Sequence, residues 1–451
     1  MPQTALAHRY PRYTSFPTAP HFHAAVAADT YAGWLEALPA DEALSLYVHV
    51  PYCESLCFFC GCHMKVTNRL SHVQRYVAAL SAEAAQVGAA LGSKRRLAHL
   101  HFGGGSPTIL PPEEIERLMA ALRALFVIDE TCEIAVEIDP RGVDEAKLDA
   151  WAAAGMTRAS LGVQDLDPKV QQAINRVQPF ETVAAVVEGL CRRGVGSINI
   201  DLVHGLPYQT VDGVRQTIRQ VLSLKPDRLA LFGYAHVPAM KPHQRLIPEA
   251  ALPGPAERHA QLQAACDELS AAGYEAIGLD HFARPDDALA QAARAGRLHR
   301  NFQGYTTDDA AILIGLGPSS ISELPQGYAQ NQVDISLWAQ TVEAGRLATR
   351  RGIALRPTDH LRRAVIERLM CDYAADIGRL AVAHKLDPRA IEDAWPRLAP
   401  LEAAGVVTRV GLHIAIPFAA RHQVQRVAAC FDDRFTGPEV MPGPQPQAAC
   451  A

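Results

Sequence analysis

The sequence has 451 residues, of which 49% are hydrophobic and 20% charged, and its formal net charge is −5 at pH 7. This composition is typical of a folded globular protein and excludes low-complexity, collagen-like and small disulfide-scaffold chains. The slightly acidic balance provides no global basic field, so we expect no nucleic-acid binding through net charge. We also expect no secretory signal in residues 1–10 and no membrane span, because the apolar runs are short.

Short apolar runs alternate with amphipathic stretches from about residue 44 to residue 280. The pattern predicts strands at 44–50, 97–102, 133–138, 159–163, 197–203, 228–234 and 274–279, with helices such as 73–91, 113–126 and 211–222 between them. This alternation is typical of parallel strands joined by right-handed crossovers. It predicts an α/β fold built on a partial (β/α) TIM-like barrel, and a doubly wound sheet is the less favoured alternative.

The rest of the chain suggests four parts. Residues 1–43 form an N-terminal segment, and residues 44–345 form the barrel with extensions, loop-rich from 281 onward. Residues 346–432 have a helical pattern that ends in a small hairpin, which predicts a winged-helix-like C-terminal domain. Residues 433–451 are rich in Pro, Gly and Gln, and we expect them to be a disordered tail.

Four cysteines lie within ten residues, directly after the first predicted strand: Cys53, Cys57, Cys60 and Cys62. The first three have the spacing C-x3-C-x2-C, which gives an iron–sulfur cube three thiolates and leaves one iron without a protein ligand. An open iron can bind and reduce a small molecule. A zinc site is less favoured, because structural zinc sites usually pair two C-x2-C units a dozen or more residues apart. The position after a strand places the cysteines at the C-terminal mouth of a barrel, where catalytic loops lie.

Polar residues follow the later strands. A Gly-Gly-Gly-Ser-Pro-Thr loop at 103–108 would let a ligand approach the backbone closely. Glu137, Gln164 and Asp201 lie in or beside apolar strands, where an unpartnered polar group is costly, so we expect a polar ligand near them. We interpret Asp139 and Asp165 instead as helix N-caps or solvated strand ends.

These residues resemble those of the radical S-adenosylmethionine enzymes. In that family three cysteines hold a 4Fe–4S cluster, and S-adenosylmethionine chelates the open iron and is cleaved to a 5′-deoxyadenosyl radical. The further motifs resemble the oxygen-independent coproporphyrinogen III oxidases from about residue 9 to 432; they lie at 12–19, 60–62, 199–207, 280–285 and 300–307.

The resemblance implies an anaerobic oxidoreductase of porphyrin and haem biosynthesis that converts two propionates of coproporphyrinogen III to vinyl groups, giving protoporphyrinogen IX. The resemblance implies that Cys53, Cys57 and Cys60 bind the cluster, and that Cys62 is needed for activity without binding it. One S-adenosylmethionine would contact Tyr47, Gly104, Glu137 and Ile321. A second would contact Phe59, Gly105, Ser106, Gln164, Arg176, Asp201 and Ala235.

The resemblance also predicts a lid at residues 12–19 over the substrate site, with Arg12, Arg284 and Arg300 as candidates to hold propionates. It implies a monomer served by an unidentified electron donor of the flavodoxin or ferredoxin type. We expect a cytoplasmic location, because exposed thiols and iron–sulfur clusters suffer in oxidising compartments. Two alternatives remain within the superfamily: a haem-binding chaperone and a haem-degrading radical methyltransferase.

Overall fold

The computed structural model describes residues 10–437, which form two compact units. We call the first the barrel unit; it contains Phe22–Leu252 and Asp308–Ala354. We call the second the C-terminal unit; it contains Pro253–Thr307, the described residues up to His21 and those from Leu355 onward. In the part of the chain that the structure describes, no helix is both long and apolar enough to cross a membrane.

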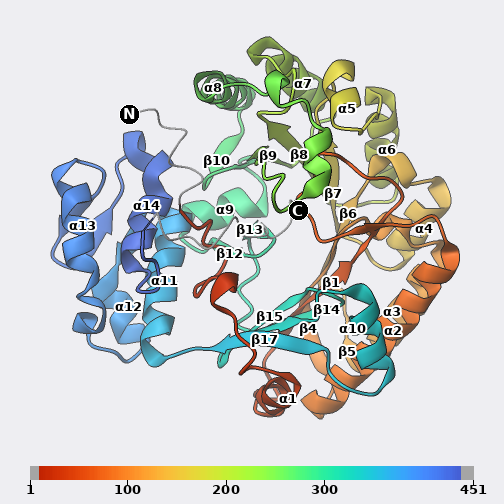
Figure 1. Ribbon diagram of the computed structural model, residues 1–451, viewed down its shortest axis with the longest axis horizontal. Coiled ribbons are helices and arrows are strands. Elements are labelled where there is room, and N and C mark those ends of the chain that lie inside the picture. The colour runs from red at the N-terminus through yellow and green to blue at the C-terminus, as the bar shows by residue number, and fades with distance from the viewer. Residues whose placement is uncertain (1–9, 438–451) are drawn as a thin grey trace. The chain divides into compact units, whose positions relative to one another are not determined.

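The barrel unit contains a curved sheet whose neighbouring strands are parallel in the order β9-β8-β7-β6-β4-β1-β14 (Figure 1). The bounds are β1 Leu44–Val50, β4 Arg95–Gly104, β6 Glu133–Ile138, β7 Arg158–Gln164, β8 Ser197–His204, β9 Arg228–Gly233 and β14 Leu313–Leu316. The sheet continues antiparallel through β15 (Ile321–Leu324), β16 (Gly327–Asn331) and β17 (Thr349–Ala354). Short strands β2 (Tyr52–Cys53) and β3 (Lys65–Val66) pair with each other, and β5 (Phe126–Val127) pairs with β4.

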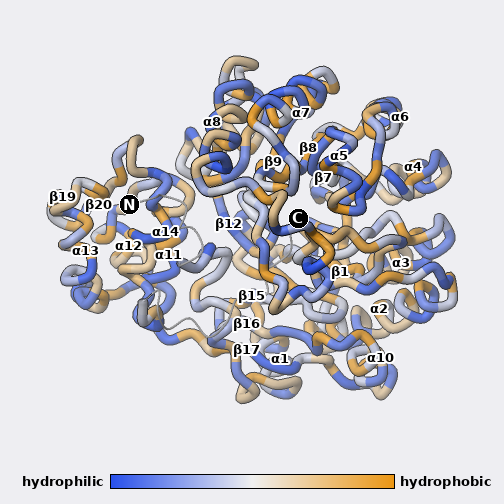
Figure 2. Tube along the Cα trace, turned by 45° about the horizontal axis from the view of Figure 1, so that its top comes forward, coloured by the Kyte–Doolittle hydropathy of each residue, from blue (hydrophilic) through white to orange (hydrophobic). Residues whose placement is uncertain are grey.

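Helices cover the outer side of this sheet (Figure 1). They are α2 Leu70–Leu91, α3 Pro112–Leu125, α4 Glu145–Ala153, α5 Pro168–Ala173, α6 Phe180–Arg192 and α7 Val211–Ser223; α1 Ala28–Glu36 and α10 Ile335–Glu343 complete the unit. Figure 2 shows hydrophobic and hydrophilic residues alternating along these helices, as expected when one face packs on a sheet. The longest, α2, is capped at its C-terminus by Gly92, whose positive φ of 70° favours glycine.

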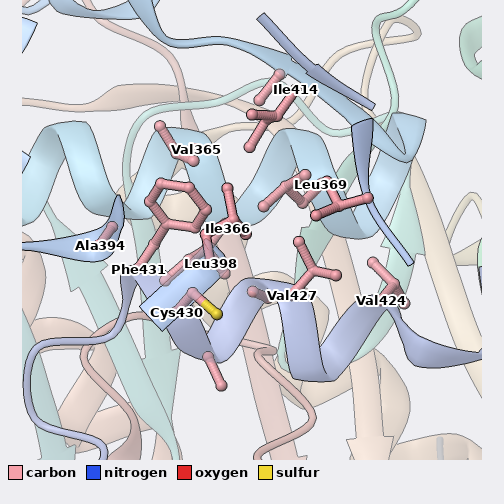
Figure 3. Close-up of a cluster of buried hydrophobic side chains, with 14 of the residues drawn as sticks. Val365, Ile366, Leu369, Ala394, Leu398, Ile414, Val424, Val427, Cys430 and Phe431 are labelled. Carbon is pink, nitrogen blue, oxygen red and sulfur yellow. The ribbon is translucent and has the colours of Figure 1, made fainter. Parts of the chain in front are cut away.

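The C-terminal unit is mostly helical. Its helices are α8 Pro255–Ala271, α9 Ala288–Arg294, α11 Pro357–Asp372, α12 Ile377–Ala383, α13 Ala394–Ala403 and α14 Val424–Ala428. Two antiparallel hairpins, β10 (Glu275–Ile277) with β11 (His281–Ala283) and β12 (His299–Asn301) with β13 (Gly304–Thr306), accompany an antiparallel sheet β18-β20-β19 (Ala374–Asp376, His413–Ala415, Thr408–Val410). Figure 3 shows its core, where side chains such as Ile366, Leu369 and Phe431 point toward one another.

The structure confirms the first six predicted strands, the three predicted helices and the C-terminal hairpin. The prediction of a loop-rich region at 281–345 is wrong, because β11 to β16, α9 and α10 lie there. These strands have three to five residues, too few to show a clear alternation. The predicted strand at 274–279 becomes β10 and pairs antiparallel with β11, whereas the seventh parallel strand of the barrel unit is β14.

The two units divide the chain differently from the predicted parts. Residues 253–307 group with the C-terminal helices, and residues 308–354 group with the barrel strands. Asp433 pairs with Arg356, and Arg434 pairs with Asp359, so the ordered chain extends past the predicted start of the tail. The rest of the predicted tail, residues 438–451, lies outside the described residues.

Candidate active site

The cysteine loop follows β1 and begins at Pro51, with Cys53 ending β2. Hydrogen bonds from other parts of the barrel unit hold the backbone of this loop. On one side, Phe58 N donates to the Ile174 carbonyl at 2.9 Å, and Asn175 Nδ2 donates to the Leu56 carbonyl at 2.7 Å. On the other, side chains of residues 241–244 donate to loop carbonyls: Gln244 Nε2 to Phe59 at 3.0 Å, His243 Nε2 to Cys60 at 2.8 Å and Lys241 Nζ to Cys62 at 2.9 Å. The fixed backbone gives the four thiols defined positions before any metal binds.

Cationic and N–H donors surround the thiols. Arg141 Nη2 and Arg176 Nη1 each lie 3.4 Å from Cys57 Sγ. The Cys62 backbone N–H donates to Cys60 Sγ at 3.3 Å, and a hydrogen bond from the Cys62 side chain lowers the pKa of Cys60 to about 7. Burial, followed by the neighbouring thiolates of Cys60 and Cys57, raises the pKa of Cys53.

This donor set fits an iron–sulfur cluster. Donors toward Cys57 and Cys60 favour thiolates, which are the ligand form of cysteine. Burial and the neighbouring thiolates of Cys60 and Cys57 raise the pKa of Cys53, and a positive metal centre among the three sulfurs would favour its thiolate form. Among residues 10–437, no three His, Cys, Asp or Glu side chains converge on the position of a single metal ion. A four-iron cluster does not require such convergence, because each thiolate bonds a different iron.

The glycine loop at the end of β4 lies against Glu137. Glu137 Oε2 accepts a hydrogen bond from Gly104 N at 2.9 Å, and its Oε1 lies 3.1 Å from His101 Nε2. Gly104 has φ +108°, and a Cβ there would lie 2.5 Å from the His49 ring. A Cβ at Gly105 would lie 2.6 Å from the Tyr52 carbonyl. Glycine is therefore required for this close packing of backbone against the cysteine loop.

Tyr47 and His49 lie on β1, which leads into the cysteine loop. His49 Nε2 lies 2.9 Å from the His63 carbonyl, and Tyr47 OH lies 3.1 Å from His49 Nδ1. Burial lowers the pKa of His49 to about 4, so the ring is neutral at pH 7. A carbonyl only accepts, so the proton is on Nε2 and Tyr47 donates to Nδ1. This chain fixes the tautomer and orients the Tyr47 hydroxyl.

Asp201 on β8 is a buried carboxylate with neutral partners. Its oxygens accept hydrogen bonds from Ser160 Oγ at 2.8 Å and from Asn199 Nδ2 at 2.7 Å. Burial raises the pKa of Asp201 to about 7, a value partly offset by these two hydrogen bonds. Gln164, at the end of β7, has φ +68°, which is unusual for a residue other than glycine.

The two predicted N-caps differ. Asp139 caps the short 3-10 helix Pro140–Gly142 through Arg141 N, which confirms the prediction. It also pairs with Arg141 at 2.6 Å and Arg176 at 3.2 Å, and these guanidiniums outweigh burial and lower its pKa to about 2. The prediction for Asp165 is wrong, because Asp167 caps α5. Asp165 is fully buried and accepts from Asp167 N and Gln209 Nε2 at 2.6 Å each.

All the predicted cluster and cofactor residues lie in the barrel unit, and most lie at the carboxyl ends of neighbouring strands, which share one edge of a parallel sheet. Ser106 bonds Thr108 at 2.9 Å, and the Ala235 carbonyl accepts from Gln244 at 3.2 Å. Ile321 begins β15. The sequence analysis missed Arg141, which no local motif distinguishes from a surface arginine.

The three arginines predicted for propionates lie in the C-terminal unit. Arg12 pairs with Asp280 at 3.5 Å, and the exposed Arg284 pairs with Asp286 at 3.0 Å. Arg300 stacks over the Tyr305 ring at 4.4 Å from its centroid. The Nε and Nη1 atoms of Arg300 are buried and have no hydrogen-bond partner within residues 10–437.

Comparison with known proteins identifies the chain's relatives. Residues 47–221 match the model of the radical SAM superfamily. The chain is 49% identical over 424 residues to the oxygen-independent coproporphyrinogen III oxidase of Bradyrhizobium diazoefficiens, covering 94% of each chain. It is 40% identical to the corresponding Escherichia coli protein, covering 94% of this chain and 92% of the relative.

The chain belongs to the oxygen-independent coproporphyrinogen III oxidases.

The solved structure of coproporphyrinogen III oxidase from Escherichia coli, described as a radical SAM enzyme, has a TM-score of 0.90 with this chain at 39% identity. That match covers 94% of this chain and 98% of the solved one. The family resemblance and the predicted fold class are therefore confirmed. Membership of the radical SAM superfamily implies a 4Fe–4S cluster and S-adenosylmethionine. The individual site residues and the second S-adenosylmethionine stay predictions.

Proposed function

We propose that this coproporphyrinogen III oxidase converts two propionate side chains of coproporphyrinogen III to vinyl groups and releases protoporphyrinogen IX and CO2. The observation that carries the proposal is the cysteine loop after β1, with N–H donors directed at two of its sulfurs, in a chain 49% identical to a named family member over 94% of its length. The two superfamily alternatives, a chaperone and a methyltransferase, become outcomes of the test below.

In this proposal Cys53, Cys57 and Cys60 hold the cluster, and one S-adenosylmethionine contacts Tyr47, Gly104, Glu137 and Ile321. When bound, these groups would supply the electron and the carbon radical needed to remove hydrogen from a propionate β-carbon, and loss of CO2 with transfer of one electron to an external acceptor would leave the vinyl group. Glu137 presents carboxylate oxygens beside Gly104 for an ammonium group. The phenylalanines of the cysteine loop keep water from the sulfurs, since Phe59 is buried.

We further propose a second S-adenosylmethionine near Phe59, Gly105, Ser106, Gln164, Arg176, Asp201 and Ala235. The support is chemical: Asp201 offers a carboxylate to ribose hydroxyls, and Arg176 offers a guanidinium to a carboxylate. Both side chains are buried, and the Nε atom of Arg176 has no hydrogen-bond partner within residues 10–437. Two propionates react in turn, and a second cofactor would serve the second reaction or assist hydrogen transfer.

Substrate binding requires cations for the propionates of the tetrapyrrole. Arg300 is the best supported of the three candidates, because two of its buried nitrogen atoms lack partners within the described chain. A substrate carboxylate would supply them. We also propose a monomer in the reducing cytoplasm, with residues 12–19 as a lid and a flavodoxin- or ferredoxin-type electron donor.

The test is an anaerobic assay with purified protein, dithionite, S-adenosylmethionine and coproporphyrinogen III. We expect protoporphyrinogen IX, identified by mass as the loss of two CO2 and four hydrogens. A product that gains a methyl group would indicate the methyltransferase, and stoichiometric haem transfer to an acceptor without turnover would indicate the chaperone. Formation of 5′-deoxyadenosine without protoporphyrinogen IX would contradict the substrate assignment.

Two cysteine variants separate cluster binding from chemistry. We expect Cys53→Ala to lose both iron and activity, because the cluster loses one of three ligands. We expect Cys62→Ser to keep its iron and lose activity, because Cys62 is not a ligand. Iron analysis and the anaerobic assay measure both. A Cys62→Ser protein without iron would overturn this division of roles.

A further inference from the structure

We propose that Arg141, oriented by Asp139, is a positioning residue that holds the Cys57 thiolate and raises the reduction potential of the cluster. The inference rests on the proposed function, because it presupposes a cluster on Cys53, Cys57 and Cys60. It extends that function by assigning a role to a side chain that belongs neither to the ligands nor to the cofactor contacts.

The geometry directs Arg141 at a ligand sulfur. Arg141 Nη2 donates to Cys57 Sγ at 3.4 Å and also pairs with Asp139 Oδ2 at 2.6 Å. Its Nε donates to Asp139 Oδ1 at 3.0 Å, so the carboxylate binds the Nε–Nη2 edge of the guanidinium in a bidentate pair. This pair fixes the plane of the guanidinium, and Nη2 also contacts the sulfur.

Asp139 also fixes the neighbouring arginine. Arg176 Nη1 donates to Asp139 Oδ2 and Nη2 to Asp139 Oδ1, both at 3.2 Å, and Nη1 lies 3.4 Å from Cys57 Sγ. The Gly162 carbonyl holds Arg176 Nη2 from the other side at 2.5 Å. One carboxylate therefore places two guanidiniums around one sulfur, and the group keeps a net charge of +1 beside Cys57.

Burial strengthens the electrostatic effect. The side chain of Arg141 is 18% exposed, and Cys57 is 7% exposed, so water screens the N–H···S contact weakly. Reduction adds one electron from the external donor to the cluster and makes its sulfurs more negative. Hydrogen bonds to ligand sulfurs and nearby positive charge stabilise that reduced state, and the potential rises. The role thus matches an enzyme whose first step is reduction of the cluster.

The experiment is an anaerobic redox titration of the cluster-loaded, full-length protein, followed by the electron paramagnetic resonance signal of the reduced cluster. In Arg141→Met, which keeps the side-chain bulk and loses the charge, we expect a lower potential. At a fixed potential the ratio of reduced to oxidised cluster should fall by about tenfold, the equivalent of one charge-assisted hydrogen bond. Arg192→Met is the matched control, because Arg192 pairs with Glu145 and Glu188 at the exposed surface of the same unit.

Asp139→Asn should shift the reduction potential in the opposite direction from Arg141→Met. Asparagine keeps one acceptor oxygen for Arg141 and removes a negative charge, so the potential should rise. A purely structural role predicts no such opposition. An unchanged potential in Arg141→Met, or shifts of the same sign in both variants, would overturn the proposal; the Asp139→Asn arm stands alone if Arg141→Met does not fold.

Failure of the proposed function looks different. Wild-type protein would then hold no iron–sulfur cluster, or would hold one that never cleaves S-adenosylmethionine under strong reduction. Failure of this inference leaves a cluster that cleaves S-adenosylmethionine and whose potential does not respond to Arg141.

Discussion

Two carboxylates of the barrel unit, one half-buried and one fully buried, are stabilised in different ways. Asp139, beside the cysteine loop, accepts hydrogen bonds from two arginines, and its pKa falls to about 2. Glu83, on α2, is 2% exposed, and the partners of its side-chain oxygens are neutral donors. Burial raises the pKa of Glu83 to about 7, although these hydrogen bonds oppose the rise.

The partners of Glu83 belong to the segment that follows β14. Gly317 N donates to Oε2 at 2.7 Å, and Asn331 Nδ2 and Trp338 Nε1 donate to Oε1 at 2.7 and 3.1 Å. Gly317 has φ +94°, and a Cβ there would lie 2.6 Å from the His49 carbonyl. Tyr76, one heptad before Glu83 on α2, donates to that same carbonyl at 2.7 Å.

The difference shows two ways of supporting one site. The arginine-rich cluster around Asp139 keeps a constant charge near the sulfurs at any physiological pH. The Glu83 cluster instead fixes backbone positions: it ties α2 to the turn that precedes Ile321, a predicted cofactor contact. Cationic partners set electrostatic potential, whereas neutral donors around a carboxylate set geometry and leave its charge dependent on pH.

The largest expected effect on stability comes from Glu83→Ala. The change leaves the buried N–H groups of Gly317 and Trp338 without an acceptor and opens a void, which should lower the free energy of unfolding by about 3 kcal/mol or more. Asp139→Ala should cost about 1–2 kcal/mol, because both arginines retain other acceptors: Cys57 Sγ for both and the Gly162 carbonyl for Arg176. Anaerobic urea denaturation of both variants measures the order. An equal or larger loss in Asp139→Ala would contradict the comparison.

The pH dependence of stability sharpens the same contrast. The folded state raises the pKa of Glu83 from 4.5 to about 7, so it binds the proton more tightly than the unfolded chain does. The stability contributed by Glu83 therefore falls as pH rises from 4.5 to 7, by about 3 kcal/mol at most. Glu83→Gln removes the titratable group, so the variant lacks this pH dependence. The difference in urea midpoint, wild type minus Glu83→Gln, should be smaller at pH 7.5 than at pH 5.5. The same difference at both pH values would contradict the prediction.

The features that could be predicted from the sequence are the alternating strands and helices and the four cysteines that lie close together in the chain. The recognised parallel strands, β1, β4, β6, β7, β8 and β9, have six to ten residues and showed their pattern. The carboxyl ends of parallel strands share one edge, so Glu137, Gln164 and Asp201 could be placed together. Strands β14 to β17 could not be recognised, because most of them are short. In addition, β14 contains Gly315 and is followed by Gly317, and at both positions other backbone packs too closely for a Cβ.

The supporting residues were harder to predict. The contact between Arg141, Arg176 and Cys57 joins three loops distant in sequence, and no spacing rule connects them. Glu83 did carry a signal: it interrupts the apolar face of α2 formed by residues such as Tyr76, Leu80 and Val87. A charged residue at a core position of an amphipathic helix indicates a buried partner, although the sequence does not show which one.

The smallest expected effect compares a buried hydrogen bond near Glu83 with an exposed ion pair. Ser320 Oγ donates to the Gly317 carbonyl at 2.7 Å and lies 3.1 Å from Asn331 Nδ2, so Ser320→Ala should cost about 1 kcal/mol in the same unfolding assay. Glu343→Gln is the control, because Glu343 forms an exposed ion pair with Arg75 and should leave the urea midpoint unchanged. Ser320→Ala should also raise the KM for S-adenosylmethionine with iron content unaltered, since the turn before Ile321 loosens. If Glu343→Gln shifts the urea midpoint as much as Ser320→Ala does, the buried hydrogen bonds around Glu83 stabilise this turn no more than an exposed ion pair would.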